Sequence, residues 1–66
     1  MRTEPFPLPE MLGQYRQFGQ LGPAYKIVSP LRPVDDNDWL LLIQIAETGE
    51  KVEYRFSRAE QDPVVH

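Results

Sequence analysis

A strand–loop–strand pattern in the second half of the chain constrains the fold most. The run DWLLLIQIA (38–46) is rich in strand formers, and KVEYRFS (51–57) alternates apolar and polar residues after the loop ETGE (47–50). A loop of two or four residues centred on Thr48 and Gly49 places the apolar partners on one face. The predicted pairs are Ile45 with Val52, Ile43 with Tyr54, and Leu41 with Phe56. Because a one-residue slip would move every side chain to the other face, we expect this register.

Two further elements are predicted before this hairpin. AYKIVS (24–29) has the pattern of a strand, and Pro30 and Pro33 are expected to end it. Residues 9–18 are predicted to form a helix, because apolar residues recur there at spacings of three and four. These apolar residues are Leu8, Met11, Leu12, Tyr15 and Phe18.

The expected fold class is α+β, with one N-terminal helix packed on a three-stranded antiparallel β-meander and a short C-terminal helical turn. The turn is predicted from a capping box formed by Ser57 and Glu60. Prolines at every second position make residues 1–8 an extended arm, and residues 9–66 form a single small domain. A small SH3-like barrel is the alternative, because short strands with a single terminal turn also fit that fold.

Leu40 and Leu42 are expected on the sheet face that the helix does not cover, close to Arg55. Two leucines on one strand form a patch rather than scattered surface residues. We predict that this patch is covered by Phe6 and Leu8 of the arm or by another protein subunit. These five residues are the candidate interface.

The chain is small and acidic, which argues against several functions. Its 66 residues fit one domain, and the absence of cysteine excludes disulfides and thiolate catalysis. The net charge is −3, about +2 over residues 1–34 and about −5 over the remainder, so direct nucleic-acid binding is not expected. The N-terminal residues contain no apolar core of the length that a signal peptide needs, and no apolar run is long enough to span a bilayer. These features predict a cytoplasmic protein with no membrane partner.

Residues 35–38, DDND, are the densest cluster of oxygen ligands in the chain. A calcium loop of the EF-hand type fails here, because Trp39 replaces a ligand, Leu40 replaces the required glycine, and Ala46 replaces the final glutamate. Asp and Asn are also favoured in turns between strands. We therefore predict a connecting loop and no metal site.

The parts of an active site are missing. Ser29 and Ser57 are the only serines, and the only histidine is the terminal His66, which cannot be held in place for a catalytic triad. The glycines are isolated, so the sequence contains no phosphate-binding loop. We predict no catalytic residues, no cofactor and no small-molecule substrate.

Three short motifs are Gly22-Pro23-x-Tyr25, Glu47-Thr48-Gly49-Glu50 with Tyr54, and Asp62-Pro63. Through them, residues 13–65 resemble a family of small bacterial proteins of unknown function. The resemblance leaves out the proline-rich residues 1–9. It implies a cytoplasmic bacterial protein, and it carries over no site and no activity.

Two functions follow as hypotheses. The first is a non-enzymatic protein-interaction module that binds another protein or forms a homodimer, and it rests on Leu40, Leu42 and the missing catalytic parts. The second is an acidic regulatory, antitoxin-like partner of a basic or nucleic-acid-binding protein. Binding of the second kind should weaken steeply with salt.

Overall fold

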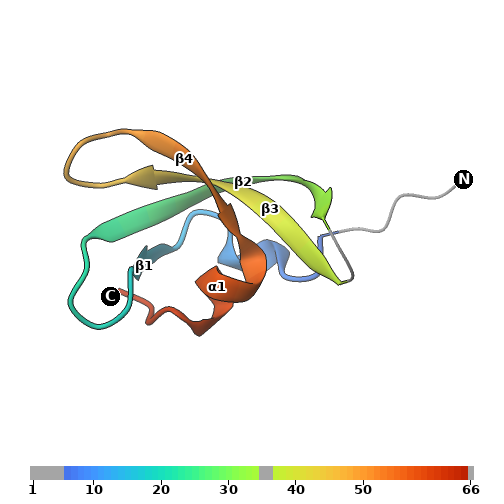
Figure 1. Ribbon diagram of the computed structural model, residues 1–66, viewed down its shortest axis with the longest axis horizontal. Coiled ribbons are helices and arrows are strands. Elements are labelled where there is room, and N and C mark those ends of the chain that lie inside the picture. Colours follow the sequence, from blue (N-terminus) through green and yellow to red (C-terminus); the bar gives the residue numbers. More distant parts are fainter. Residues whose placement is uncertain (1–5, 35–36, 66) are drawn as a thin grey trace, which may run out of the picture.

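The computed structural model describes residues 6–34 and 37–65. Four strands form one antiparallel sheet in the order β1-β2-β3-β4, and a short helix follows them (Figure 1). In chain order, the elements are the 3-10 helix η1 (Pro9–Met11), β1 (Tyr15–Gln17), β2 (Ala24–Val34), β3 (Asp38–Ile45), β4 (Lys51–Arg55) and α1 (Phe56–Gln61). The expected fold class is wrong, because the described residues contain a fourth strand in place of the N-terminal α-helix. The predicted C-terminal turn is confirmed as α1.

Residues 9–18 form a 3-10 turn and a short strand instead of the predicted helix. Gly13 has a φ of 87°, a left-handed conformation that does not fit within a right-handed α-helix. Its amide donates to the carbonyl of Ile27 at 2.7 Å, and the Ile27 amide donates to the carbonyl of Gln14 at 2.9 Å. The chain therefore joins the edge of β2. The apolar spacing was misleading, since Leu12 is 36% exposed.

β2 continues through Pro30 and Pro33, where the sequence predicted its end. β1 pairs only with Ala24–Lys26, so the later part of β2 has β3 as its one paired strand within the described residues. Proline is tolerated at a sheet edge because it needs no ladder hydrogen bond on the open side. The two prolines therefore do not terminate the strand.

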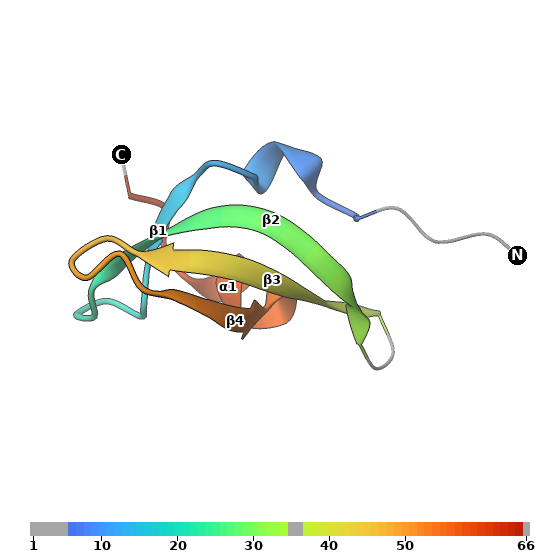
Figure 2. The same ribbon diagram turned by 90° about the horizontal axis from the view of Figure 1, so that it is seen from above.

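Two β-bulges change the periodicity of β2. The inward-facing pairs are Ile27 with Ile43, Pro30 with Leu41, and Pro33 with Trp39. Between one of these pairs and the next, β2 contains one more residue than β3. The inward positions of β2 therefore recur every three residues instead of every two. Bulges also bend a strand, and Figure 2 shows the curvature of β2 along the sheet.

The β3–β4 hairpin has the predicted faces, but its register is shifted by two residues. The Ile45 amide donates to the carbonyl of Glu50 at 2.8 Å, so the loop is formed by residues 46–49. Gly49 is its last residue and is left-handed, with a φ of 75°. The observed pairs are Leu41 with Tyr54 and Ile43 with Val52. An even shift keeps every side chain on its face, so the hydrophobic pattern cannot detect it.

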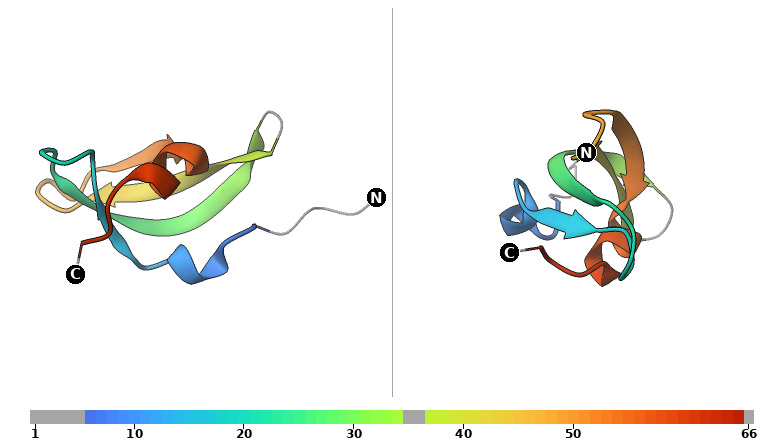
Figure 3. Two further views of the ribbon diagram at one scale, coloured as in Figure 1. Left: turned by 90° about the horizontal axis from the view of Figure 1, so that it is seen from below. Right: turned by 90° about the vertical axis from the view of Figure 1, so that its left-hand side faces the viewer.

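The core lies between the inner face of the sheet, α1 and the N-terminal segment (Figure 3). Its buried residues are Met11, Tyr25, Ile27, Leu41, Ile43, Phe56 and Ala59. The ring of Phe6 lies edge-on to Trp39 at 5.5 Å and to Phe56 at 5.3 Å between centroids. The N-terminal segment therefore packs against the domain from Phe6 onward, and a division between residues 8 and 9 stays a prediction.

Residues 63–65 extend the sheet on the free side of β1. The Gln17 amide donates to the carbonyl of Pro63 at 3.1 Å, and the Val65 amide donates to the carbonyl of Tyr15 at 2.8 Å. α1 therefore carries the chain from β4, at one edge of the sheet, back to β1 at the other. The alternative of an SH3-like barrel stays a prediction.

Candidate functional site

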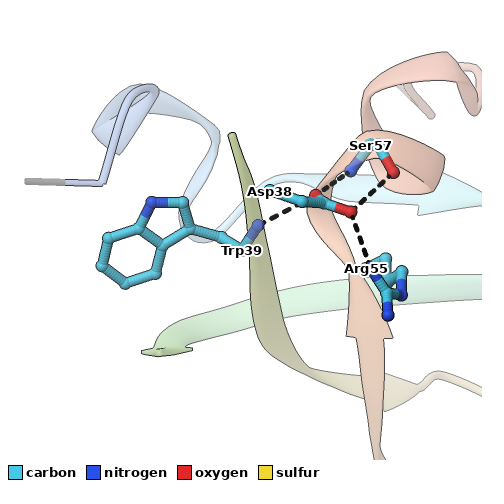
Figure 4. A network of polar contacts seen from close by, with 4 residues as sticks. All are labelled: Asp38, Trp39, Arg55 and Ser57. Carbon is cyan, nitrogen blue, oxygen red and sulfur yellow. Dashed lines mark hydrogen bonds and ion pairs between the residues drawn. The ribbon is translucent and has the colours of Figure 1, made fainter. Parts of the chain in front are cut away.

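The carboxylate of Asp38 accepts a dense set of hydrogen bonds at the start of β3 (Figure 4). Oδ1 accepts from the amide of Trp39 at 2.8 Å and from the amide of Ser57 at 3.0 Å. Oδ2 accepts from the Ser57 hydroxyl at 3.0 Å and from the Arg55 guanidinium at 3.3 Å. Burial alone raises the pKa of Asp38, but these hydrogen bonds outweigh it and hold the pKa below its usual range.

This network holds the N-terminus of α1 in place. The helix begins at Phe56, and Arg55 at the capping position contributes no side-chain cap. Asp38 supplies the cap from another strand by accepting from the second amide of the helix. The capping box predicted for Ser57 and Glu60 is therefore wrong, because Ser57 lies inside the helix and its hydroxyl binds Asp38.

The DDND segment divides between the described and undescribed parts of the chain. Asn37 has a φ of 65°, a left-handed conformation that agrees with the predicted turn. Asp38 belongs to β3, and its two oxygens are already bonded to Trp39, Ser57 and Arg55. The other members, Asp35 and Asp36, lie outside the described residues, and within those residues no three acids or histidines cluster as metal ligands.

A second carboxylate, Asp62, lies at the C-terminus of α1 and connects distant segments. Its Oδ2 accepts from the hydroxyl of Tyr25 at 2.7 Å and from that of Tyr54 at 2.9 Å. Its Oδ1 accepts from the amide of Gly19 at 3.2 Å. The ring of Phe18 packs on both tyrosines, with centroid distances of 4.4 and 5.3 Å. Tyr25, Tyr54 and Asp62 come from the three motifs of the family resemblance, and they meet at this carboxylate.

The two phenols act as neutral donors. Burial, followed by the hydrogen bond and negative charge of Asp62, raises the pKa of Tyr54 to about 12. The same causes raise the pKa of Tyr25 further. Through these two hydrogen bonds, Asp62 connects the sheet to the C-terminus of α1.

Arg16 binds the carbonyl groups at the C-terminal end of α1. Its guanidinium donates to the carbonyls of Ala59 at 2.9 Å and of Asp62 at 3.0 Å, and a third bond goes to Glu60 at 3.4 Å. Cations stabilise helix C-termini by bonding the last free carbonyls. No local pattern in the sequence connects Arg16, Asp38 or Asp62 to α1, so their roles are visible only in the folded structure.

The outer face of the sheet carries an apolar strip, which we define as Val28, Leu31, Leu40 and Leu42. Leu40 and Leu42 alternate with the buried Leu41 and Ile43, so they point away from the core. The register partner of Leu42 is Ser29 and that of Leu40 is Arg32. Val28 and Leu31 are the extra residues of the two bulges, next to Ser29 and Arg32, and both lie between inward positions of β2. Val28 is 36% and Leu31 40% exposed, while both β3 leucines are half-buried.

The residues of the predicted interface lie on two opposite faces. Leu40 and Leu42 are on the outer face, where Arg55 is the register partner of Leu40. Phe6 and Leu8 pack on the core side instead. The structure therefore places Leu40, Leu42 and Arg55 together and separates them from the N-terminal residues.

The outer face is also more basic than the protein as a whole. Register positions on this face carry four cations and two carboxylates, although the chain has a net charge of −3. The cations are Lys26, Arg32, Lys51 and Arg55, and the carboxylates are Asp38 and Glu53. Asp38 is buried with 9% exposure, so Glu53 is the accessible acid among these strand positions.

A comparison with models of protein families shows which family the chain belongs to. The model of a family of unknown function matches residues 3–66. The chain belongs to this family, DUF5397. The match also includes residues 3–12, which the resemblance found in the sequence had left out. No curated protein matches the chain.

Helices in the described residues are too short to cross a bilayer. The longest, α1, has 6 residues, whereas a spanning helix needs about 20 apolar ones. No helix in residues 6–34 and 37–65 has the length and apolar character of a membrane span. The expected cytoplasmic location stays a prediction.

Proposed function

We propose that this DUF5397 protein is a non-enzymatic protein-interaction module whose docking surface is the outer face of the sheet. The observation that supports it is the apolar strip. Two bulges turn Val28 and Leu31 outward beside Leu40 and Leu42, and the core segments Phe6–Met11 and α1 pack on the other side. When a partner removes such a strip from water, the free energy of the system falls, which favours binding.

The non-enzymatic part of the proposal is supported by the polar clusters. The buried Asp38 and the partly buried Asp62 are both bonded to groups that fix α1, and Asp62 accepts a hydrogen bond from each of the two phenols. Each cluster therefore has a structural role that accounts for its residues. The hypothesis of an acidic partner for a basic protein gains no support from the outer face, since that face carries mostly cations.

The test compares three forms of the protein in affinity capture from the source cells with quantitative mass spectrometry. Leu40→Ser/Leu42→Ser should lose a partner that the wild type retains. Leu21→Ser is the matched control, because Leu21 is 98% exposed and lies in the loop before β2. Circular dichroism checks that all three forms are folded.

The partner found in this way is then purified and titrated by calorimetry. Complete burial of an exposed leucine side chain contributes about 1.5–3 kcal/mol, but Leu40 and Leu42 are already half-buried before binding. The double variant should therefore bind at least about fivefold more weakly. Equal affinity of the wild type and the double variant would rule out the outer face as the docking surface.

A further inference from the structure

A groove of about 210 Å³ lies at the end of the apolar strip that is closer to the β3–β4 loop. Its lining residues are Tyr15, Lys26, Gln44, Ile45, Ala46 and Gly49. Tyr15 pairs with Lys26, and Lys26 pairs with Gln44, so these three side chains leave the same face of neighbouring strands. Pockets for small-molecule ligands usually measure about 300–1,000 Å³. This groove therefore has the size for one side chain rather than for a metabolite.

The groove offers hydrogen-bond donors and a positive charge. Lys26 makes no ion pair within the described residues, and no acid lines the groove. Tyr15 is 46% exposed, and its phenol hydroxyl is a second donor. The side-chain amide of Gln44 donates to the carbonyl of Gly49 at 3.1 Å, which fixes the wall next to the loop. A group with negative charge and two acceptor oxygens, a carboxylate, complements this set.

The spacing along β3 connects the groove to the apolar strip. Gln44, Leu42 and Leu40 follow one another at two-residue intervals on the outer face, about 6.6 Å apart at the rise of a strand. An extended partner segment has the same two-residue period. A segment with the pattern acid-x-apolar-x-apolar therefore matches the groove and the strip in order.

We propose that the groove receives the carboxylate of an acidic residue from an extended segment of a partner protein, with apolar residues two and four positions away on the strip. This inference rests on the proposed function. A second copy of the chain fits less well as the occupant. Each outer face carries four cations and two carboxylates, a net charge of +2, so two copies facing each other would bring like net charges together, which disfavours an interface.

The test is a nuclear magnetic resonance titration of the full chain with capped peptides. The probe is acetyl-Thr-Glu-Thr-Leu-Thr-Leu-Thr-amide, and its control has glutamine in place of the glutamate. We expect the glutamate peptide to shift the amide signals of Lys26, Gln44 and Leu42. An exposed ion pair contributes little, so the glutamine peptide should bind about twofold to fivefold more weakly, and this difference should shrink with salt.

Variants separate the two parts of the proposal. Lys26→Met should abolish the difference between the two peptides. Arg58→Met removes one positive charge from α1 and should preserve that difference. If both peptides bind the wild type equally but lose binding with Leu40→Ser/Leu42→Ser, the docking face stands and the carboxylate site is wrong. If the double variant binds both peptides like the wild type, the proposed function fails as well.

Two further measurements identify other occupants. Acetate alone is titrated at the same concentrations, and shifts equal to those of the glutamate peptide would reduce the groove to an adventitious anion site. Light scattering over a range of protein concentrations gives the mass. A dimer whose formation shifts the same amide signals would overturn the inference in favour of a second copy.

Discussion

The inner face of the sheet buries Leu41 and Ile43 completely, whereas the outer face leaves Val28 36% and Leu31 40% exposed. Both faces are formed by β2 and β3. The inner side chains meet α1 and the N-terminal segment, and carboxylates fix α1 at its two ends. The apolar residues of the outer face lie outside this closed set of contacts. Within the described residues, the core lies on one side of the sheet, and the other side is the face that we propose as the docking surface.

The largest expected effect compares two neighbours on β3. Leu41→Ala should lower the free energy of unfolding by about 2–5 kcal/mol, because it leaves a cavity in a packed core. Leu42→Ala should cost about 1 kcal/mol or less, since its side chain is half-buried. Urea unfolding measures both changes, and Ile43→Val provides a milder inner-face variant if Leu41→Ala does not fold. Equal costs for the two leucines would contradict the difference between the faces.

The next effect concerns the connection between the sheet and α1 through Asp62. Asp62→Ala should cost about 3 kcal/mol, because the hydroxyls of Tyr25 and Tyr54 lose their shared acceptor. Glu60→Ala, on an exposed position of the same helix, is the control and should change the unfolding free energy by less than about 0.5 kcal/mol. Equal effects of the two variants in urea unfolding would show that the Asp62 contacts contribute nothing.

A smaller effect is expected at the other end of the helix. Asp38→Ala should cost about 2 kcal/mol, because it removes the cap of α1. Since folding lowers the pKa of Asp38, this stabilisation is present above about pH 4 and is lost as the pH falls below that value. Asp38→Asn should therefore show a smaller loss of stability in acid, measured by urea unfolding from pH 6 to pH 2. Glu53→Ala serves as the control on the outer face.

The smallest effect appears in alkali. Folding raises the pKa of Tyr54 from 10.0 to about 12, so its contribution is complete below about pH 10 and is lost as the pH rises towards 12. We expect the wild type to lose about 1 kcal/mol by pH 11 from this group. Tyr54→Phe should lack that part of the loss, whereas Tyr15→Phe on the outer face should retain it. Identical alkaline profiles for all three proteins would show that the contact with Asp62 does not favour the neutral phenol.

The sequence by itself determined the presence of β2, β3 and β4 and the side on which the residues of the hairpin strands lie. Alternation is a local property, so Leu41 and Ile43 were assigned correctly to the inner face and Leu40 and Leu42 to the outer face. The same pattern could not give the register, because a shift by two residues leaves every side chain on its face. That register depends on the left-handed Gly49 at the end of the loop.

Only the tertiary structure decided the N-terminal region and the ends of α1. Residues 9–18 carry a helical spacing, yet the left-handed Gly13 and the open edge of β2 make them a turn and a strand. Asp38 bonds Ser57 over a sequence separation of 19 residues, and Asp62 bonds Tyr25 over 37. No local propensity encodes such contacts, because the donor and the acceptor meet only after the sheet has brought distant segments together. The same reason explains why the outward position of Leu31 was visible only once β2 was paired with β3.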